Sequence, residues 1–139
     1  MSGDFLDSNV LVYLLTPQDD RKHRISRDIV VSALEGQSAT ISYQVVQETL
    51  NVLTRRLLHP ITAQNLRGMF QQFLLPLWTV MPSPALYESA LSVRERYQYS
   101  FYDSLIIAAA LEAGCGRLLS EDLQHDQQIE GLRIVNPFR

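Results

Sequence analysis

Four acidic residues of this 139-residue chain lie where an apolar run ends or is interrupted. They are Asp7 in DFLDSNVLVYLL, Glu48 in VVQETLNVL, Asp103 in YSFYDSLIIAAAL and Asp122 in RLLSEDL. An ionised carboxylate is costly to place against apolar surface unless another group compensates its charge. The chain has a single lysine, Lys22, and most of its arginines lie in other segments. We therefore expect a divalent cation as the missing partner, and a fold that brings the four acids together.

Short apolar segments typical of strands alternate with longer segments of helical periodicity. The predicted strands span residues 5–6, 39–41, 77–81, 117–119 and 132–135. The predicted helices span residues 10–15, 19–35, 43–58, 62–74, 84–97 and 101–113. This alternation predicts an α/β fold with a mostly parallel sheet. The chain contains no internal repeat, linker or low-complexity segment, so we expect one domain over residues 1–139.

The acids are placed so that they can meet at one edge of such a sheet. Ligands of open parallel sheets bind beyond the carboxyl ends of the strands. Asp7 and Asp122 each follow a predicted strand, Glu48 lies in the second turn of the helix after another, and Asp103 lies in the first turn of its helix. Clustered carboxylates repel one another, and hard, oxygen-preferring Mg²⁺ or Mn²⁺ would relieve that repulsion. Zinc fits poorly, because Cys115 and the three histidines show no zinc-binding spacing.

Each acid also has an ordinary structural explanation, which the sequence leaves open. Asp7 can cap the helix that follows it, and Asp122 can be a turn residue after a strand. Asp103 stands three residues after Ser100, which is the pattern of a capping box. Glu48 is the hardest to explain in this way, because apolar residues precede and follow it.

The composition is that of an ordinary globular protein, with 46% hydrophobic and 19% charged residues. One cysteine excludes an internal disulfide and agrees with a reducing compartment. The N-terminus lacks the pattern of a secretory signal, and the longest uncharged run, residues 68–87, is broken by prolines and therefore fits a helix, a turn and a strand rather than a membrane span. We expect a soluble, cytoplasmic protein without a membrane partner.

The net charge of −3 and the isoelectric point of about 5.5 weigh against nucleic-acid binding when the chain is considered as a whole. Basic residues nevertheless cluster locally, and a bound cation would add positive charge that the sequence does not count. The clusters are Arg21, Lys22, Arg24 and Arg27, then Arg55 and Arg56, and then Arg94 and Arg96. The more common explanation of such clusters, a solvated helix face, remains open for each of them.

The segments that carry the acids resemble the PIN-domain family, in particular the VapC-like ribonuclease toxins of bacterial toxin–antitoxin pairs. The resemblance spans essentially the whole chain, through FLDSNVLVYLL, QVVQETLNVL, YSFYDSLIIAAALEAGCGRLLSEDLQH and IVNPF. It implies a three-layer α/β/α domain with a short-stranded, mostly parallel central sheet, and a metal-dependent endoribonuclease activity. It also implies a homodimer and a small antitoxin partner whose tail covers the active site.

By the same resemblance, four acids would hold Mg²⁺ or Mn²⁺, with three polar or acidic neighbours in support. The ligands would be Asp7, Glu48, Asp103 and Asp122, and the supporting residues Asn9, Ser120 and Glu121. The chain departs from its close relatives at two positions: Asp126 stands where they commonly have glycine, and Tyr102 where they often have tryptophan.

The resulting hypothesis is hydrolysis of an RNA phosphodiester, in a single strand or a loop, by water activated on the metal. Candidate stacking residues for the bases are Tyr43, Tyr99, Phe101 and Tyr102, although core packing is the more common role of such aromatics. The alternative is a catalytically silent PIN-like module that binds RNA or a partner peptide. Titration with Mn²⁺ distinguishes the two. A phospho-accepting domain and a serine or cysteine hydrolase are disfavoured, because their characteristic lysine or motifs are missing.

Overall fold

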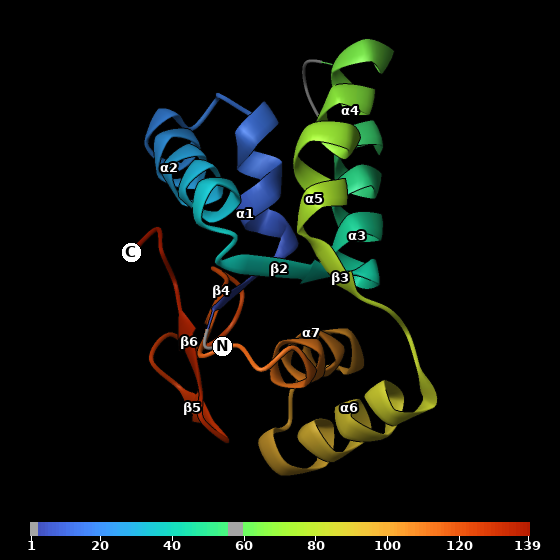
Figure 1. Ribbon diagram of the computed structural model, residues 1–139. Coiled ribbons are helices and arrows are strands. Elements are labelled where there is room, and N and C mark those ends of the chain that lie inside the picture. The colour runs from blue at the N-terminus through green and yellow to red at the C-terminus, as the bar shows by residue number, and fades with distance from the viewer. Residues whose placement is uncertain (1–2, 56–59) are drawn as a thin grey trace.

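The computed structural model describes residues 3–55 and 60–139 (Figure 1). Within these residues the strands form one six-stranded sheet in the order β3-β2-β1-β4-β6-β5. The strands are β1 (Asp4–Leu6), β2 (Ala39–Ser42), β3 (Trp78–Val80), β4 (Arg117–Leu119), β5 (Gln128–Ile129) and β6 (Leu132–Val135). All neighbouring pairs are parallel except β5 with β6. The expected α/β fold with a mostly parallel, short-stranded sheet is therefore confirmed.

Helices cover both faces of the sheet, which gives the expected three layers (Figure 1). They are α1 (Ser8–Val12), α2 (Asp20–Gly36), α3 (Tyr43–Arg55), α4 (Ala63–Met69), α5 (Leu75–Leu77), α6 (Pro84–Tyr97) and α7 (Phe101–Glu112). A 3₁₀ turn at Tyr13–Leu15 extends α1, and a π turn at Phe70–Leu74 joins α4 to α5. The helices α1 to α5 lie on one side of the sheet, and α6 and α7 pack together on the other.

Local sequence signals explain where most helices begin. The side chains of Asp19, Thr62, Ser83 and Ser100 each accept a hydrogen bond from a backbone N–H of the first turn that follows. These bonds satisfy N–H groups that have no partner inside the helix. Helix α7 is buried on every side from Ser104 to Ala110, as its uninterrupted apolar run predicted.

The structure differs from the sequence prediction at several boundaries. Helix α1 begins at Ser8 rather than at residue 10, and the helical segment predicted to stop at residue 74 continues through the π turn to Leu77. Helix α2 continues one residue past its predicted end at residue 35, to Gly36, and Gln37 takes the left-handed conformation that ends the helix, with φ of 50°. The predicted end of the third long helix, at residues 56–58, lies outside the described residues.

Strand β5 was not predicted. It pairs with β6 in a hairpin whose two turn residues, Glu130 and Gly131, have φ values of 51° and 90°. A two-residue turn with both φ values positive matches the twist of a hairpin. A strand of two residues is too short to show a periodic pattern, and it could therefore not be predicted from the residues alone.

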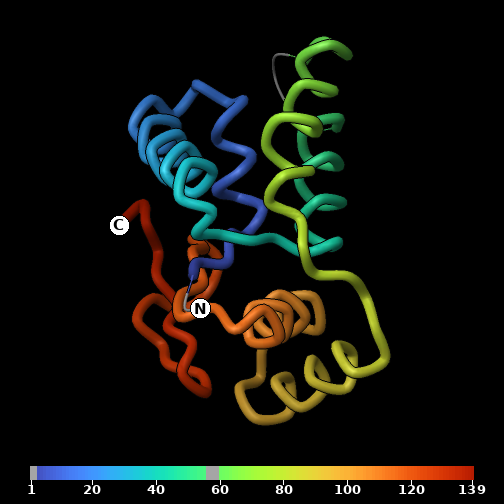
Figure 2. Tube along the Cα trace, in the orientation of Figure 1, coloured from blue at the N-terminus to red at the C-terminus, as the bar shows by residue number. Residues whose placement is uncertain are grey.

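The centre of the sheet positions the edge where the acids were expected. Strand β1 pairs with β2 on one side and with β4 on the other, and Leu6 is in register with Leu119. In the trace of Figure 2 the dark blue β1 segment lies beside the orange β4 segment near the middle of the molecule. Asp7 and Ser120, the residues that follow, therefore leave the sheet side by side, and the Asp7 N–H donates to the Leu119 carbonyl at 3.0 Å. Phe5 and Leu6 are fully buried and hold this edge in the core.

The uncharged run at residues 68–87 forms the end of α4, the π turn, α5, β3 and the start of α6. Among the described residues, none of the helices has the length and apolar character needed to cross a membrane.

Candidate active site

The four acids proposed from the sequence line one pocket of about 230 Å³ at the carboxyl edge of the sheet. Four separate segments contribute them: the β1–α1 junction, the second turn of α3, the first turn of α7 and the turn after β4. The pocket is lined by Asp7, Ser8, Glu48, Asn51, Val52, Asp103, Ile106 and Asp122. The folded chain thus brings together side chains that are up to 115 positions apart (122 − 7).

Asp7 is the most deeply placed of the four, with only 5% of its surface exposed. One carboxylate oxygen accepts a hydrogen bond from the Ser8 N–H at 2.7 Å, and the other accepts one from the Ser120 hydroxyl, also at 2.7 Å. The Asp7 pKa is raised from 3.8 to about 7, mainly by burial. The two hydrogen bonds lower it, and the charges of Glu48 and Asp122 contribute to the rise. The helix-cap role considered from the sequence is therefore real, but it occupies only one oxygen.

Ser120 connects three of the surrounding groups. Its hydroxyl donates to Asp7 and accepts from the Asp122 N–H at 3.1 Å and from the Asn9 amide at 3.4 Å. The Asn9 amide also donates to the Asp122 carboxylate at 3.1 Å. Asn9 and Ser120 thereby fix the orientation of both Asp7 and Asp122.

We expect Ser120→Ala to lower the free energy of unfolding by about 2 kcal/mol near pH 8. The substitution removes a hydrogen bond to a buried carboxylate and leaves the Asp122 N–H without its acceptor. Urea denaturation measures the change, with the exposed Ser32→Ala in α2 as the matched control. Equal midpoints for the two variants would show that the serine does not hold the carboxylates.

Glu48 is partly exposed and projects from α3 into the pocket. Its two oxygens accept hydrogen bonds from the Ser8 hydroxyl at 3.3 Å and the Gln44 amide at 3.1 Å. Burial raises the pKa of Glu48, and the charges of Asp103 and Asp122 add to that rise. These mutual effects show that the four acids are close enough to act on one another.

Asp103 is held by its backbone rather than by its side chain. Its N–H donates to the Ser100 hydroxyl at 3.2 Å, which is one half of the capping box considered from the sequence. Among residues 3–55 and 60–139, no hydrogen bond or ion pair to the Asp103 carboxylate is present. The cap therefore does not use this carboxylate, which lines the pocket instead.

Glu121 lies apart from the four acids and has its own cation. Its carboxylate accepts hydrogen bonds from the Lys22 ammonium at 2.8 Å and the Tyr13 hydroxyl at 2.6 Å. The Lys22 ammonium also lies over the rings of Tyr13 and Phe138. We infer that this ion pair anchors the turn after β4 to α2, and thereby the backbone that carries Asp122.

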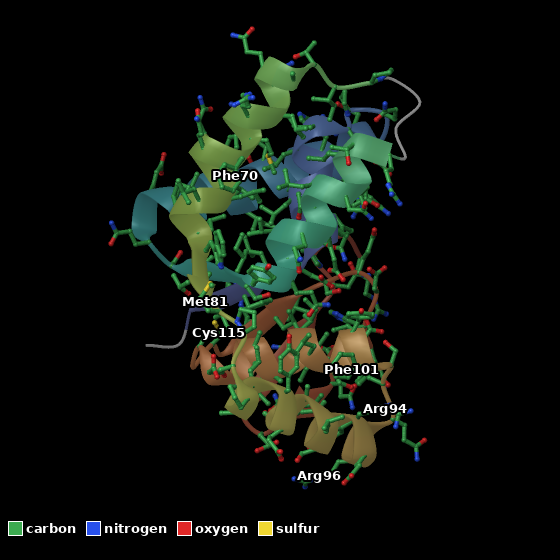
Figure 3. All side chains as sticks on the ribbon, turned by 90° about the vertical axis from the view of Figure 1, so that its right-hand side faces the viewer. Phe70, Met81, Arg94, Arg96, Phe101 and Cys115 are labelled. Carbon is green, nitrogen blue, oxygen red and sulfur yellow. The ribbon has the colours of Figure 1, made fainter. Side chains whose placement is uncertain are left out.

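Two basic residues of the α2 cluster are held within the protein: Lys22 pairs with Glu121, and Arg21 donates to the carbonyls of Phe138 and Arg139. Arg24 is exposed and lies 3.6 Å from Asp20, and Arg27 is exposed as well. The solvated helix face considered from the sequence therefore fits Arg24 and Arg27, whereas Lys22 and Arg21 make internal contacts. Arg94 and Arg96 are exposed on α6 (Figure 3), and the structure of Arg56 lies outside the described part of the chain.

No ion pair to any of the four acids occurs in the described part of the chain. Over the same residues, no group of three or more acidic, histidine or cysteine side chains is already arranged to hold a metal ion. Carboxylates without compensating charge repel one another, and three of the four accept hydrogen bonds from neighbouring groups.

Sequence reasoning missed two residues that hold the acids in place, Ser8 and Gln44. Gln44 lies four residues before Glu48 in the same helix, and that spacing places the two side chains on one face. The spacing was therefore a usable signal. Ser8 gave none, because its contact with Glu48 spans 40 positions.

The structure explains why glycine suits position 126. Asp126 has φ of 68°, in the left-handed region that glycine enters without strain. Its carboxylate pairs with Arg133 at 2.5 Å, which lowers the Asp126 pKa. The charge that this departure adds is thus compensated locally, and Asp126 does not line the acidic pocket.

The fold and the acidic pocket define the class of protein, an α/β domain with clustered carboxylates at the edge of its sheet. The family model for the PIN domain matches residues 5–128, and the chain belongs to this family. A search of curated proteins found no match to the sequence.

Solved structures with the same fold include toxins and toxin–antitoxin complexes. A toxin–antitoxin complex from Klebsiella pneumoniae is similar over 97% of this chain and 98% of its own, at 18% identity and a TM-score of 0.68. VapC20 of Mycobacterium tuberculosis, a toxin that cleaves the sarcin–ricin loop, is similar over 84% and 87%, at 21% identity and a TM-score of 0.60. FitAcB of Neisseria gonorrhoeae is similar over 97% and 98%, at 20% identity and a TM-score of 0.62.

Proposed function

We propose that this protein is a metal-dependent endoribonuclease and the toxin of a toxin–antitoxin pair. One observation supports this most directly: four carboxylates from four distant segments line one pocket, and no cation of the described residues neutralises them. Bringing carboxylates together in this way costs free energy of folding, because like charges repel one another. Such clusters are therefore a common sign of a functional site.

The donor set fits Mg²⁺ or Mn²⁺. All the candidate ligands are carboxylate oxygens, which hard divalent cations prefer, and the pocket is open enough to leave positions for water or substrate. The raised pKa of Asp7 and of Glu48 means that added positive charge would stabilise their ionised forms. Asp7, Glu48, Asp103 and Asp122 would hold the ion.

A divalent ion bound here would activate water and stabilise charge on the phosphate. The residues of the chain supply orientation and proton transfer. Ser120 and Asn9 hold Asp7 and Asp122 in place, while Ser8 and Gln44 hold Glu48. One of the four carboxylates would accept the proton of the attacking water, and Glu48, which is partly exposed, is the candidate we propose.

The proposed substrate is RNA in a single strand or a loop, where the bases are unstacked and accessible. VapC20, which shares the fold, cleaves such a loop, and we extend the class of substrate from it to this protein as a proposal. A small antitoxin is proposed as partner because a similar fold is found in a toxin–antitoxin complex. A homodimer is proposed from the resemblance to the PIN-domain family.

The test is incubation of the purified, antitoxin-free protein with labelled structured RNAs, first with Mg²⁺ or Mn²⁺ and then with EDTA. We expect cleavage at discrete positions that EDTA abolishes and added Mn²⁺ restores. Cleavage that persists unchanged in EDTA would contradict a metal-dependent mechanism, and no cleavage of any RNA with either metal would remove the assignment as a nuclease.

One observation favours the alternative, a catalytically silent PIN-like module. Within the described residues the acids are not pre-arranged around a metal ion. Such a module would bind RNA or a peptide without affinity for Mn²⁺, and Glu48→Gln would leave its stability unchanged. If the protein binds no Mn²⁺ and Glu48→Gln has the stability of the parent protein, the silent module is the correct assignment.

A further inference from the structure

A second cavity, of about 300 Å³, lies next to the acidic pocket between the starts of α3, α6 and α7. Four of its lining side chains are large and unusually exposed: Tyr102 at 66%, Met81 at 55%, Tyr87 at 42% and Tyr43 at 38%. Phe101 lines the cavity as well, and Figure 3 labels it together with Met81. Aromatic side chains exposed around one cavity are a common sign of a ligand, because soluble proteins usually bury them.

Three of the aromatic rings around this cavity contact one another, whereas the ring of Tyr43 lies against that of Trp78. Phe101 stacks on Tyr87 with ring centres 6.3 Å apart, and meets Tyr102 edge-on at 5.5 Å. Tyr99, the fourth aromatic considered from the sequence, does not line the cavity, because its hydroxyl is bonded to Gln127. The remaining rings form a wall on which a flat ligand can stack.

One residue that lines the cavity has a buried polar atom without a partner in the described residues. Gln44 lines the cavity and is only 9% exposed. Its amide nitrogen donates to the Glu48 carboxylate and to the Tyr102 carbonyl, both at 3.1 Å. These two acceptors fix which end of the amide is nitrogen, so the oxygen is the end that has no hydrogen-bond partner in the described residues. A buried acceptor of this kind is costly unless a ligand supplies a donor.

The same residue joins the cavity to the acidic pocket. Gln44 contacts Glu48 directly, and Tyr102 precedes Asp103 in the chain. A ligand in the cavity would therefore contact residues that directly adjoin two of the four acids, Glu48 and Asp103. None of the residues that line the cavity is charged, which disfavours a phosphate group and favours a neutral aromatic one.

We propose that this cavity binds one unpaired nucleobase of the RNA, stacked on the exposed aromatic rings and donating an N–H to the Gln44 carbonyl oxygen. This inference rests on the proposed function. It names the part of the RNA, one base, that fixes how the RNA lies relative to the four acids. Stacking on an aromatic side chain contributes enough to change affinity about 5- to 150-fold for each base. The base held here would place a neighbouring phosphate at the four acids and set the cleavage position.

The test uses short oligoribonucleotides that each carry one 2-aminopurine, whose fluorescence is quenched on stacking, at successive positions. Binding is measured in Mg²⁺ with protein carrying Asp103→Asn, which prevents cleavage. We expect quenching at one position only, and Tyr102→Ala to weaken binding about 5- to 150-fold and abolish that quenching. Tyr102→Phe, which keeps the ring, and Leu75→Ala, a matched truncation of a residue 50% exposed elsewhere, should both behave as the parent protein.

An abasic nucleotide at the quenched position should weaken binding by the parent protein by the same factor as Tyr102→Ala does. It should leave the affinity of the Tyr102→Ala variant unchanged. At that position, unsubstituted purine, which has no N–H on its pairing edge, should bind about two- to tenfold more weakly than 2-aminopurine, because nothing then donates to Gln44.

The outcomes separate this inference from the proposed function. Full RNA cleavage together with unchanged binding by Tyr102→Ala overturns the base site and leaves the nuclease assignment standing. Position-specific quenching in a protein that cleaves no RNA supports the base site and removes the nuclease assignment. Sedimentation in which Tyr102→Ala dissociates a dimer, without any effect on RNA, overturns the base site in favour of a second copy of the chain.

Discussion

Asp103→Asn and Glu48→Gln should each reduce RNA cleavage about 100-fold or more and leave the fold intact. A factor of 100 corresponds to about 2.7 kcal/mol of transition-state stabilisation, within the several kcal/mol that a correctly held metal ion contributes. Each substitution removes one anionic oxygen from the pocket and keeps nearly the same shape. Initial rates on one labelled RNA at saturating Mn²⁺ measure the effect.

The matched controls make the same chemical changes on the surface of α2. Asp28→Asn and Glu35→Gln alter exposed residues that do not line the acidic pocket, and their rates should stay within about twofold of the parent protein. Asp103→Asn is the sharper of the two tests, because its carboxylate accepts no hydrogen bond in the described residues. Equal rates for Asp103→Asn and the parent protein would end the assignment of the pocket as the reacting centre.

Without divalent metal, the protein should become less stable as the pH rises from about 4 to about 7. The pKa of Asp7 is about 7 in the folded protein and 3.8 as an ordinary carboxyl. Between these values the folded protein keeps a proton that the unfolded chain has lost, and the free energy of unfolding therefore falls as the pH increases. The raised pKa of Glu48 acts in the same direction. The full Asp7 shift corresponds to about 4 kcal/mol as an upper bound.

Urea denaturation in EDTA across this pH range measures the fall, and Asp7→Asn is the variant that removes its main cause. Its stability should be nearly flat from pH 5 to pH 8 and should exceed that of the parent protein at pH 8. Added Mn²⁺ should restore the parent protein at pH 8, because bound cation favours the ionised carboxylates. A metal-free parent protein that instead gains stability toward pH 8 would contradict the burial of an uncompensated Asp7.

The fold was predictable because its signals are local. The cap at Ser100 and the apolar run of α7 each act within one turn or one helix, and the structure confirms the cap and buries the run. The end of α2 was less exact, because the helix continues to Gly36, one residue past the predicted end, and the left-handed residue that ends it is Gln37 rather than a glycine. A two-residue strand such as β5 depends on its pairing with β6 and has no pattern of its own.

The grouping of the acids followed from sheet topology, whereas their supports did not. Asp7 and Asp122 follow strands, and strand ends in a parallel sheet share an edge. Contacts such as Ser8 with Glu48, or Lys22 with Glu121, join residues 40 and 99 positions apart and depend on the exact packing of helices. Lys22 illustrates the point, because its sequence context suggested a solvated helix face and the fold places it in an ion pair.

Calorimetric titration of the metal-free protein with Mn²⁺ at pH 7 tests the central claim, that these carboxylates share one cation. Repeating the titration in buffers of different ionisation enthalpy counts the protons released. We expect saturable binding that releases protons, because Asp7 is about half protonated near pH 7 before the metal enters. The same binding should be lost in Asp7→Asn and kept in Asp28→Asn. A folded parent protein that takes up no Mn²⁺ at millimolar concentration would contradict the account.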